Sequence, residues 1–449
     1  MLDIQFIRDN PEKVKKAVKS RGCDITVVDR FLRVDETRRQ LIAEVQKWRE
    51  ERNKLTKSKI GFSKASATEG KRIKEMLRRL EPDLKAVEEE SKNLLYEIPN
   101  LPSEDTPLGK GEADNLEIKA WIPIEGYLPK NKLGTGWISK KYMPDKPPHA
   151  IQKDFKPKPY YLLGDSLGID MKQAALVSGS RFTYLKGEVV ILLYAIFDFL
   201  KSKLVKENFT PMVVPLLVKD WPLYGTSHFP QGRDQVYRIS NENVEEKETL
   251  NLIGSSEPSL FAYFGGKILK YGELPAKVFA QTSCFRSEVG SWGKDVRGIK
   301  RNHQFDKVEM DVVCRSDQSE EVFDYLLGIN EWLLQSLELP YRLWLKSTAD
   351  MGYHASYKQC DFEAWLPASQ EFIEEGTDTN ATDYQARRMN VKYKDKDGTK
   401  KFCHTVNDTG VATRILLAIL ENYQQKDGSV AIPKVLQKYT GKKVILPNR

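Results

Sequence analysis

The sequence lacks the cysteine and histidine spacings that hold metals or build disulfide frameworks. Its five cysteines never form a CxxC pair, and its five histidines never form HxxxH. We therefore expect free thiols in a reducing compartment and no transition metal held by the protein. A GxGxxG fingerprint and a GxxxxGK[ST] phosphate loop are also missing, so neither of these nucleotide-binding architectures is expected.

Long apolar runs are missing as well, because no stretch reaches the roughly 18 apolar residues of a membrane span. Residues 1–10 carry acidic side chains and no apolar signal-peptide core, which favours the cytoplasm. With 449 residues, 40% hydrophobic and 30% charged, the chain is expected to be soluble and to form at least two domains. The formal charge of +8 is weak evidence for a polyanionic partner.

The first third of the chain has the pattern of a helical hairpin. Residues 33–60 contain neither Gly nor Pro, and their apolar residues from Leu41 to Leu55 form one helical stripe. A break is expected over residues 61–70, and a second stripe follows over Ile73–Leu95. Two narrow stripes of this kind bury each other as an antiparallel coiled coil. Pro82 lies within the second helix, where it predicts a kink or a missing hydrogen bond.

Cations gather around the turn of this hairpin. They are Lys54, Lys57, Lys59, Lys64, Lys71, Arg72, Lys74, Arg78 and Arg79. On an isolated helix such a cluster is usually a solvated face. At the end of a projecting arm it indicates contact with an RNA backbone, made through charge and shape.

Composition divides the chain into three expected segments. They are the arm at 1–105, a connector at 106–170 that is rich in Pro, Gly and Lys, and a domain of mixed helix and strand at 171–449. Within the last segment, the apolar spacing of Glu188–Lys206 predicts a helix.

Two strands joined by a basic, glycine-rich loop carry the chemistry. Lys277–Arg286 and Phe305–Cys314 are the predicted strands. Strand parity puts Arg286 and Glu288 on one side, with Glu309 facing them from the second strand. Because arginine binds phosphate and carboxylates bind ammonium, the hairpin predicts a cleft for a ligand that carries both groups. An ordinary surface hairpin is the alternative.

The letters of this hairpin, Phe285-Arg286-Ser287-Glu288 through His303-Gln304-Phe305-Asp306-Lys307-Val308-Glu309, resemble motif 2 of the seryl-tRNA synthetases. Further segments along the chain also resemble this family. They are Met1–Asp3, Ile7–Pro11, Val177–Phe182, Val213–Pro215, Asp383–Asn390 and Ile419–Gln424. The helical hairpin is similar to the tRNA-binding arm of the family.

The resemblance implies a role for individual residues. ATP would be bound by Arg286, Ser287, Glu288, Arg301, Asn302, Phe305, Glu374, Glu375, Gly376, Thr377 and Arg414. Serine would be bound by Ser255, Ser256, Glu257, Arg286, Glu309, Asn407 and Thr409. Mg²⁺ would be held by Glu374 and Thr377, and the catalytic residues would be Arg286, Arg414 and Glu374. The tRNA would be bound by Lys54, Lys57, Lys64, Lys71, Arg72 and Lys74.

The resemblance also implies an α+β fold of class II, in which helices flank an antiparallel sheet, and a homodimer. The implied reaction joins serine to ATP as seryl-adenylate with release of pyrophosphate. Serine then passes to the 3′ end of tRNA(Ser), and tRNA(Sec) stays open as a second acceptor.

Three places depart from the family pattern. Glu375 and Asp378 would bring negative charge beside the triphosphate, residues 407–414 are one residue shorter than usual, and Asn302 replaces an apolar residue. These departures leave room for one rival, an inactive paralogue that binds RNA or a partner. A second rival, a ligase that charges a carrier protein, does not predict the long basic arm.

Overall fold

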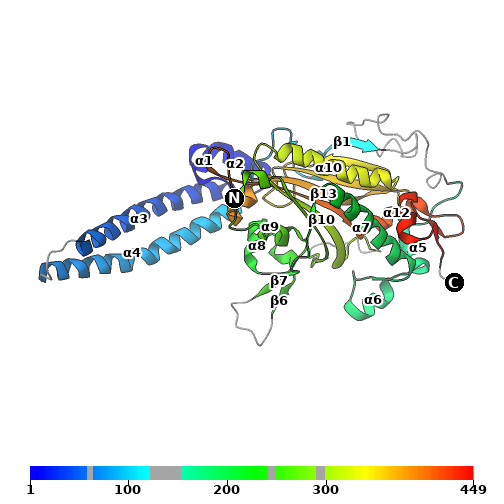
Figure 1. The fold of residues 1–449 in the computed structure, drawn as a ribbon, viewed down its shortest axis with the longest axis horizontal. Coiled ribbons are helices and arrows are strands. Elements are labelled where there is room, and N and C mark those ends of the chain that lie inside the picture. Colours follow the sequence, from blue (N-terminus) through cyan, green and yellow to red (C-terminus); the bar gives the residue numbers. More distant parts are fainter. Residues whose placement is uncertain (58–63, 122–152, 241–248, 290–298, 448–449) are drawn as a thin grey trace. The chain divides into compact units, whose positions relative to one another are not determined.

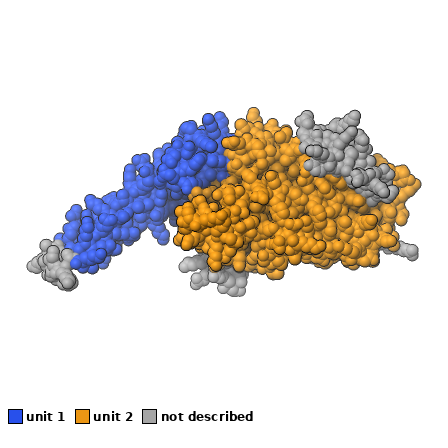
Figure 2. All heavy atoms as spheres, turned by 45° about the horizontal axis from the view of Figure 1, so that its top comes forward, with its two compact units in different colours: residues 1–101 blue, residues 102–449 orange. Residues whose placement is uncertain are grey.

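The computed structural model describes residues 1–57, 64–121, 153–240, 249–289 and 299–447, with the backbone alone at 64–66. The chain divides into two compact units, Met1–Leu101 and Pro102–Arg449, which Figure 2 colours separately.

The first unit is helical. Two short helices, α1 (Ile4–Asp9) and α2 (Pro11–Ser20), precede the long α3 (Thr26–Lys57) and α4 (Lys64–Glu97), which lie side by side (Figure 1). Val45 and Trp48 of α3 are buried against Ile73, Leu77 and Leu80 of α4. This packing confirms the predicted helical hairpin, and α4 runs through Pro82 as one helix.

Both long helices extend beyond their predicted starts. The α3 helix begins at Thr26, where the Asp24 carboxylate accepts hydrogen bonds from the Thr26 backbone N–H and hydroxyl. Its first turns bury Val27 and Phe31. The prediction began later because it relied on the charge-rich composition that starts near residue 33. The α4 helix begins at Lys64, so the break predicted over 61–70 is too long.

The second unit is built on an eight-stranded sheet. In spatial order its strands are β1 (Leu116–Trp121), β11 (Tyr341–Leu345), β12 (Lys358–Leu366), β13 (Glu371–Thr382), β16 (His404–Ala412), β10 (Gln304–Cys314), β9 (Ala276–Phe285) and β4 (Thr210–Pro211). All neighbours pair antiparallel except β4 and β9. The predicted α+β class is confirmed, and so are the two strands predicted on either side of the basic, glycine-rich loop.

Three helices pack on one face of this sheet: α7 (Glu188–Lys206), α10 (Ser319–Ser336) and α12 (Ile415–Tyr423), all visible in Figure 1. The ends of α7 are those predicted. On β10, Val308, Met310 and Val312 point into this apolar layer. Strand alternation therefore turns the polar residues between them to the opposite face, as predicted.

Shorter elements complete the second unit. The helices are α5 (Tyr160–Leu167), α6 (Met171–Ser178), α8 (Asp220–Gly225), α9 (Glu257–Ala262), α11 (Tyr384–Met389) and α13 (Gln437–Thr440). The strands are β2 (Ile169–Asp170), β3 (Tyr184–Leu185), β5 (Leu217–Val218), β6 (Arg238–Ile239), β7 (Leu250–Leu252), β8 (Ile268–Lys270), β14 (Lys392–Lys394), β15 (Lys400–Phe402), β17 (Val430–Ala431) and β18 (Val444–Ile445). Over the described ranges, none of the helices combines the length and apolar character needed to cross a bilayer.

Candidate functional site

A cavity of about 210 Å³ opens on the polar face of the large sheet. Eight residues expected from the sequence line it, namely Ser255, Glu257, Arg286, Glu309, Glu374, Thr377, Asn407 and Thr409. They come from α9, from the strands β10, β13 and β16, and from the segments that follow β7 and β9. The sheet thus brings together residues that are more than 150 positions apart in the sequence.

Two β-bulges align these side chains. Glu374 and Thr377 are three residues apart, so a regular strand would turn them to opposite faces. The pairing of β13 with β12 slips by one residue at Glu375, and both side chains consequently reach the cavity. A second slip, between β10 and β16 at Gly410, sets Thr409 opposite Glu309.

Arg286 lies at the start of the basic, glycine-rich loop, directly after β9. Its Nε donates to the Gly254 carbonyl at 3.2 Å, and its guanidinium carbon is 5.4 Å from the centroid of the Phe305 ring. A Cβ on Gly254 would come within 3.3 Å of the Arg286 side chain, so glycine permits this close contact. Among the described residues, neither terminal nitrogen of Arg286 has a hydrogen-bond partner, which leaves both for an anionic ligand.

Lys307 is the central cation of the cavity. Its buried ammonium lies 2.5 Å from Glu309 Oε2 and donates to the Ser255 hydroxyl at 2.9 Å and the Thr409 hydroxyl at 3.2 Å. The Thr409 hydroxyl in turn donates to Glu309 at 3.3 Å. One ammonium therefore fixes a carboxylate and two hydroxyl groups at the same point.

Glu257 sits beside this group with its carboxyl buried. Gln385 Nε2 donates to Glu257 Oε1 at 2.7 Å. Burial and then the nearby Glu309 charge raise the pKa of Glu257 to about 7. His228 Nε2 is 4.0 Å from the other oxygen, but burial lowers the pKa of His228 to about 3, so the ring is neutral and the contact is not ionic.

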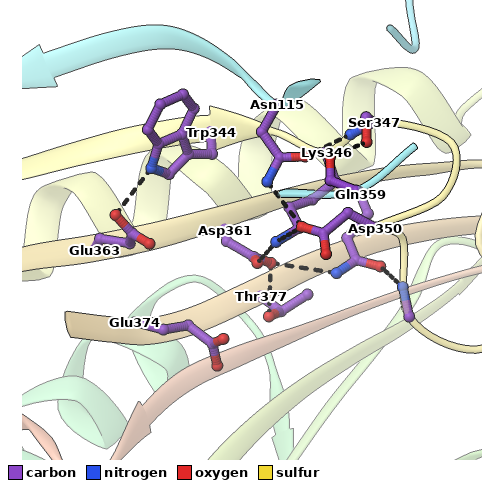
Figure 3. A network of polar contacts seen from close by, with 12 residues as sticks. Asn115, Trp344, Lys346, Ser347, Asp350, Gln359, Asp361, Glu363, Glu374 and Thr377 are labelled. Atoms are coloured by element: carbon purple, nitrogen blue, oxygen red, sulfur yellow. Dashed lines mark hydrogen bonds and ion pairs between the residues drawn. The ribbon is translucent and has the colours of Figure 1, made fainter. Parts of the chain in front are cut away.

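A polar network supports Thr377 from behind (Figure 3). The Thr377 hydroxyl donates to Asp361 Oδ1 at 2.8 Å, and Lys346 Nζ lies 2.9 Å from Asp361 Oδ2. Lys346 also pairs with Asp350, which accepts from Asn115 Nδ2 at 2.8 Å. The network holds the Thr377 hydroxyl in one orientation at the cavity wall.

Glu374 and Arg414 form the outer edge of the site. Arg414 Nη1 donates to the Glu374 carbonyl at 2.6 Å and lies 3.4 Å from its carboxylate. The Glu374 side chain is 51% exposed, so its carboxylate is open to an incoming cation.

The oxygen donors of Glu374 and Thr377 suit Mg²⁺, which typically takes one or two protein oxygens together with substrate phosphates. The described residues contain no cluster of three or more His, Cys, Asp or Glu side chains able to hold a metal by themselves. A phosphate-bearing substrate would therefore complete any magnesium site here.

The parity prediction for Glu288 is wrong. The β9 strand ends at Phe285, and Glu288 has a left-handed backbone with φ of 51°. Its buried carboxylate pairs with Arg301 instead of lining the cavity. The Ser287 hydroxyl is likewise engaged, by the carbonyl of Asp234 at 2.5 Å. Loop residues 290–298 lie outside the described residues.

A second cavity, of about 400 Å³, adjoins Phe305 and Asn302. Phe182, Tyr184 and Thr413 also line it. Asn302 Nδ2 donates to the Thr183 hydroxyl at 3.2 Å, while its buried Oδ1 has no partner among the described residues. Asn302 thus keeps one unsatisfied acceptor at this wall.

Glu375 and Asp378 contradict the expectation that they bring charge to a triphosphate. Both side chains point to the helix-covered face, where Glu375 meets Leu333 and Leu334 of α10 and Asp378 lies in register with Asp408. Burial raises the pKa of Glu375 to about 8 and the pKa of Asp378 well above its ordinary value, so both are held neutral.

The neighbours of these two residues are also arranged around the inner face. Asn330 Nδ2 donates to both Asp408 oxygens at 2.6 Å. Gly376 lies against Thr409, whose carbonyl oxygen would come within 2.6 Å of an added Cβ.

Ser256 is buried and does not line the cavity.

Several cavity residues escaped the sequence reasoning. Gly352, Tyr353 and Ser356 come from the loop between β11 and β12, and nothing in their spacing marks them. The Tyr353 ring packs against His228 in a tilted arrangement, with centroids 4.2 Å apart. Lys307 did have a signal, because it shares a strand face with Glu309 inside the quoted motif.

The comparisons with known proteins agree with this geometry. The family model described as the seryl-tRNA synthetase N-terminal domain matches residues 1–102, and the tRNA synthetase class II core domain (G, H, P, S and T) matches 237–423. The serine–tRNA ligases of Neisseria meningitidis and Symbiobacterium thermophilum are 36% and 33% identical, each over 98% of both chains.

Solved structures of related proteins give the same result. Seryl-tRNA synthetase from Pyrococcus horikoshii, complexed with ATP, has a TM-score of 0.86 at 35% identity and covers 100% of both chains. Cytoplasmic serine–tRNA ligase from Naegleria fowleri, in complex with AMP, has a TM-score of 0.82 at 29% identity, covering 100% of this chain and 99% of that one.

The buried Asp378–Asp408 pair gives a pH-dependent prediction. Burial raises both pKa values, so the folded state keeps protons that the unfolded chain loses above pH 3.8. The contribution of this pair to stability is therefore fully present below pH 3.8 and falls as the pH rises towards the folded pKa, by up to about 1.4 kcal/mol per pH unit for each group. Asp378→Asn should raise the thermal unfolding midpoint at pH 8 and change it less at pH 5.

The control is Asp397→Asn, at an exposed turn position where hydrogen bonds from Thr399 lower the pKa of the carboxyl instead of raising it. A lower midpoint for Asp378→Asn at pH 8 would contradict a neutral pair.

Proposed function

The chain belongs to the seryl-tRNA synthetase family, and from this premise we propose that it attaches L-serine to tRNA(Ser) at the expense of ATP. The observation that carries the proposal is the convergence of Arg286, Glu309 and two hydroxyl groups on one small cavity. These groups complement a carboxylate, an ammonium and a hydroxyl, which together make up serine. We infer a cytoplasmic setting.

In the first step, a serine carboxylate oxygen attacks the α-phosphorus of ATP, and the bond to pyrophosphate breaks. The Arg286 guanidinium neutralises charge on the carboxylate and on the α-phosphate, while Glu309 holds the serine ammonium. In the second step, a ribose hydroxyl of the tRNA attacks the serine carbonyl carbon and AMP leaves. No side chain acts as a nucleophile, so positioning and charge neutralisation supply the catalysis.

The ATP contacts extend outward from Arg286. Phe305 would stack on adenine, Arg414 would take the γ-phosphate, and Glu374 with Thr377 would hold Mg²⁺, which neutralises phosphate charge. The fixed orientation of the Thr377 hydroxyl supports this assignment. Glu288 and Arg301 are paired with each other, so we propose that they act on the nucleotide together.

Hydroxyl recognition centres on Ser255. Its oxygen already accepts hydrogen bonds from Lys307 Nζ at 2.9 Å and from the Glu257 backbone N–H at 3.2 Å. With both lone pairs engaged, the Ser255 hydroxyl proton is the group left to donate. A substrate hydroxyl accepts that proton, whereas alanine would leave it unpaired in a buried site. Lys307 is therefore a positioning residue for serine selection.

The helical arm supplies the tRNA contact. Lys54, Lys57, Lys71, Arg72 and Lys74 are all exposed along α3 and α4. The Arg72 guanidinium lies 5.5 Å from the Trp48 ring, which fixes one cation on the arm surface. The Lys64 side chain lies outside the described residues. The density of exposed cations on this arm suits the phosphate backbone of RNA and argues against the carrier-protein ligase.

We also propose a homodimer. Three apolar side chains are strongly exposed: Leu176 on α6 (82%), Tyr194 on α7 (51%) and Val213 just after β4 (104%). Burial of these side chains against a second copy would remove their apolar surface from water. Sedimentation equilibrium tests this assembly, with a mass near twice 51.6 kDa expected and a mass near 51.6 kDa against it.

Serine-dependent exchange of pyrophosphate into ATP tests the function and separates it from the inactive-paralogue alternative. We expect exchange with serine and far less with threonine or alanine. Arg286→Ala should reduce it about 10²–10³-fold, as expected when a transition-state charge partner is removed. Arg238→Ala, at an exposed arginine outside the cavity, is the control. Absence of exchange by the folded wild-type protein would refute the enzyme assignment.

Lys307→Met tests serine selection. Methionine matches the lysine side chain as far as its ε-carbon but lacks the ammonium, so Ser255 and Thr409 lose their common donor. The KM for serine should rise about tenfold or more, the preference over alanine should shrink, and the KM for ATP should stay within about twofold. Lys119→Met removes a half-buried ion-paired lysine outside the cavity, 2.6 Å from Glu331, and controls for loss of stability. Unchanged discrimination by Lys307→Met would contradict the role.

A further inference from the structure

A row of three lysines crosses the small sheet formed by β8, β14 and β15. Lys394 is in direct register with Lys270 on one side and with Lys400 on the other. Residues in direct register point to the same face of a sheet. All three side chains are exposed, whereas Tyr393, one position earlier on β14, is 2% exposed in the core beneath.

Like charges in direct register destabilise a sheet. Among the described residues, no carboxylate lies within ion-pair distance of Lys270, Lys394 or Lys400. The nearby acidic groups are engaged elsewhere: Asp395 pairs with Lys401 at 2.5 Å, and Asp397 accepts from the Thr399 hydroxyl at 2.6 Å. The repulsion within the row is therefore not offset by the protein's own side chains.

Aromatic rings lie among the cations of this surface. Lys392 Nζ is 4.7 Å from the Phe402 ring centroid, and Lys396 Nζ is 4.7 Å from that of Tyr271. Tyr263, which is 55% exposed, has Lys267 Nζ 3.4 Å above its ring. Tyr263 is exposed, and Phe402 and Tyr271 are half-buried. Cations interleaved with such rings fit a nucleic-acid backbone with stackable bases better than a lone anion.

The small sheet is joined directly to the serine cavity. The β8 strand follows α9, whose first residue Glu257 lines the cavity, and β15 leads into β16, which carries Asn407 and Thr409. Lys400 is seven residues from Asn407, so at most about 25 Å of chain separates them. An RNA whose 3′ end enters the cavity brings its neighbouring phosphates within that range.

We propose that this lysine row, together with its flanking aromatic residues, is a second RNA-contact surface, which binds the phosphate backbone of the tRNA being charged. The inference rests on the proposed function. It gives the catalytic unit a tRNA contact of its own, separate from the cations of the arm.

The test uses the full-length protein and an unmodified tRNA(Ser) transcript. The row variant is Lys394→Gln with Lys400→Gln. The control is Lys426→Gln with Lys443→Gln, two exposed lysines that also have no ion pair among the described residues. Lys71→Gln with Lys74→Gln provides the comparison on the arm. Filter binding from 50 to 200 mM salt measures affinity, and serine-dependent pyrophosphate exchange reports the integrity of the cavity.

We expect the row variant to bind tRNA about tenfold more weakly, with the slope of log K against log salt reduced by about 1.5, because two phosphate contacts are lost. The control should stay within about twofold, and exchange should be unchanged in both. Wild-type affinity and slope in a row variant that still catalyses exchange would overturn the proposal. Unchanged tRNA affinity with dissociation to monomers would also overturn it, since the row would then belong to a protein interface. Failure of the proposed function would show itself separately, as absence of exchange in the wild-type protein.

Discussion

The buried ion pair between Lys307 and Glu309 is the interaction on which the serine cavity depends. Glu257 and Glu309 line the cavity, and Asp311 lies two residues after Glu309 on the same face of β10. Burial and the repulsion among these carboxylates raise the pKa of Glu257 and of Asp311, so the group needs a cation beside it. Lys307 supplies the cation that pairs with Glu309, and its remaining protons fix the hydroxyl groups of Ser255 and Thr409. Charge balance and substrate recognition thus come from the same ammonium group.

The large sheet separates two environments that have opposite requirements. Its cavity face keeps Arg286 and Glu374 available to ligands, while its inner face packs on α7, α10 and α12. Asp378 and Asp408 lie on the inner face, where Asn330 satisfies the second of them. Carboxyl groups that would repel a triphosphate if they faced the cavity lie instead on the inner face, where burial keeps them neutral.

Much of this architecture follows from periodicity. The ends of α7, the pairing of β9 with β10 and the helical hairpin all come from apolar spacing, because burial of those residues is what stabilises the elements. The bulges at Glu375 and Gly410 leave no such trace, so the direction of Glu375 and Asp378 could not be predicted. The left-handed backbone at Glu288 defeated a parity argument, and Tyr353 enters the cavity through tertiary folding alone.

A crystal structure with a stable sulfamoyl analogue of seryl-adenylate tests the account most directly. We predict that the serine amino group will lie within about 2.7–3.2 Å of Glu309 and the serine hydroxyl within the same distance of Ser255, with Arg286 at the sulfamoyl group. An analogue bound elsewhere, or bound in the cavity with its amino group away from Glu309, would contradict the central role of the Lys307–Glu309 pair.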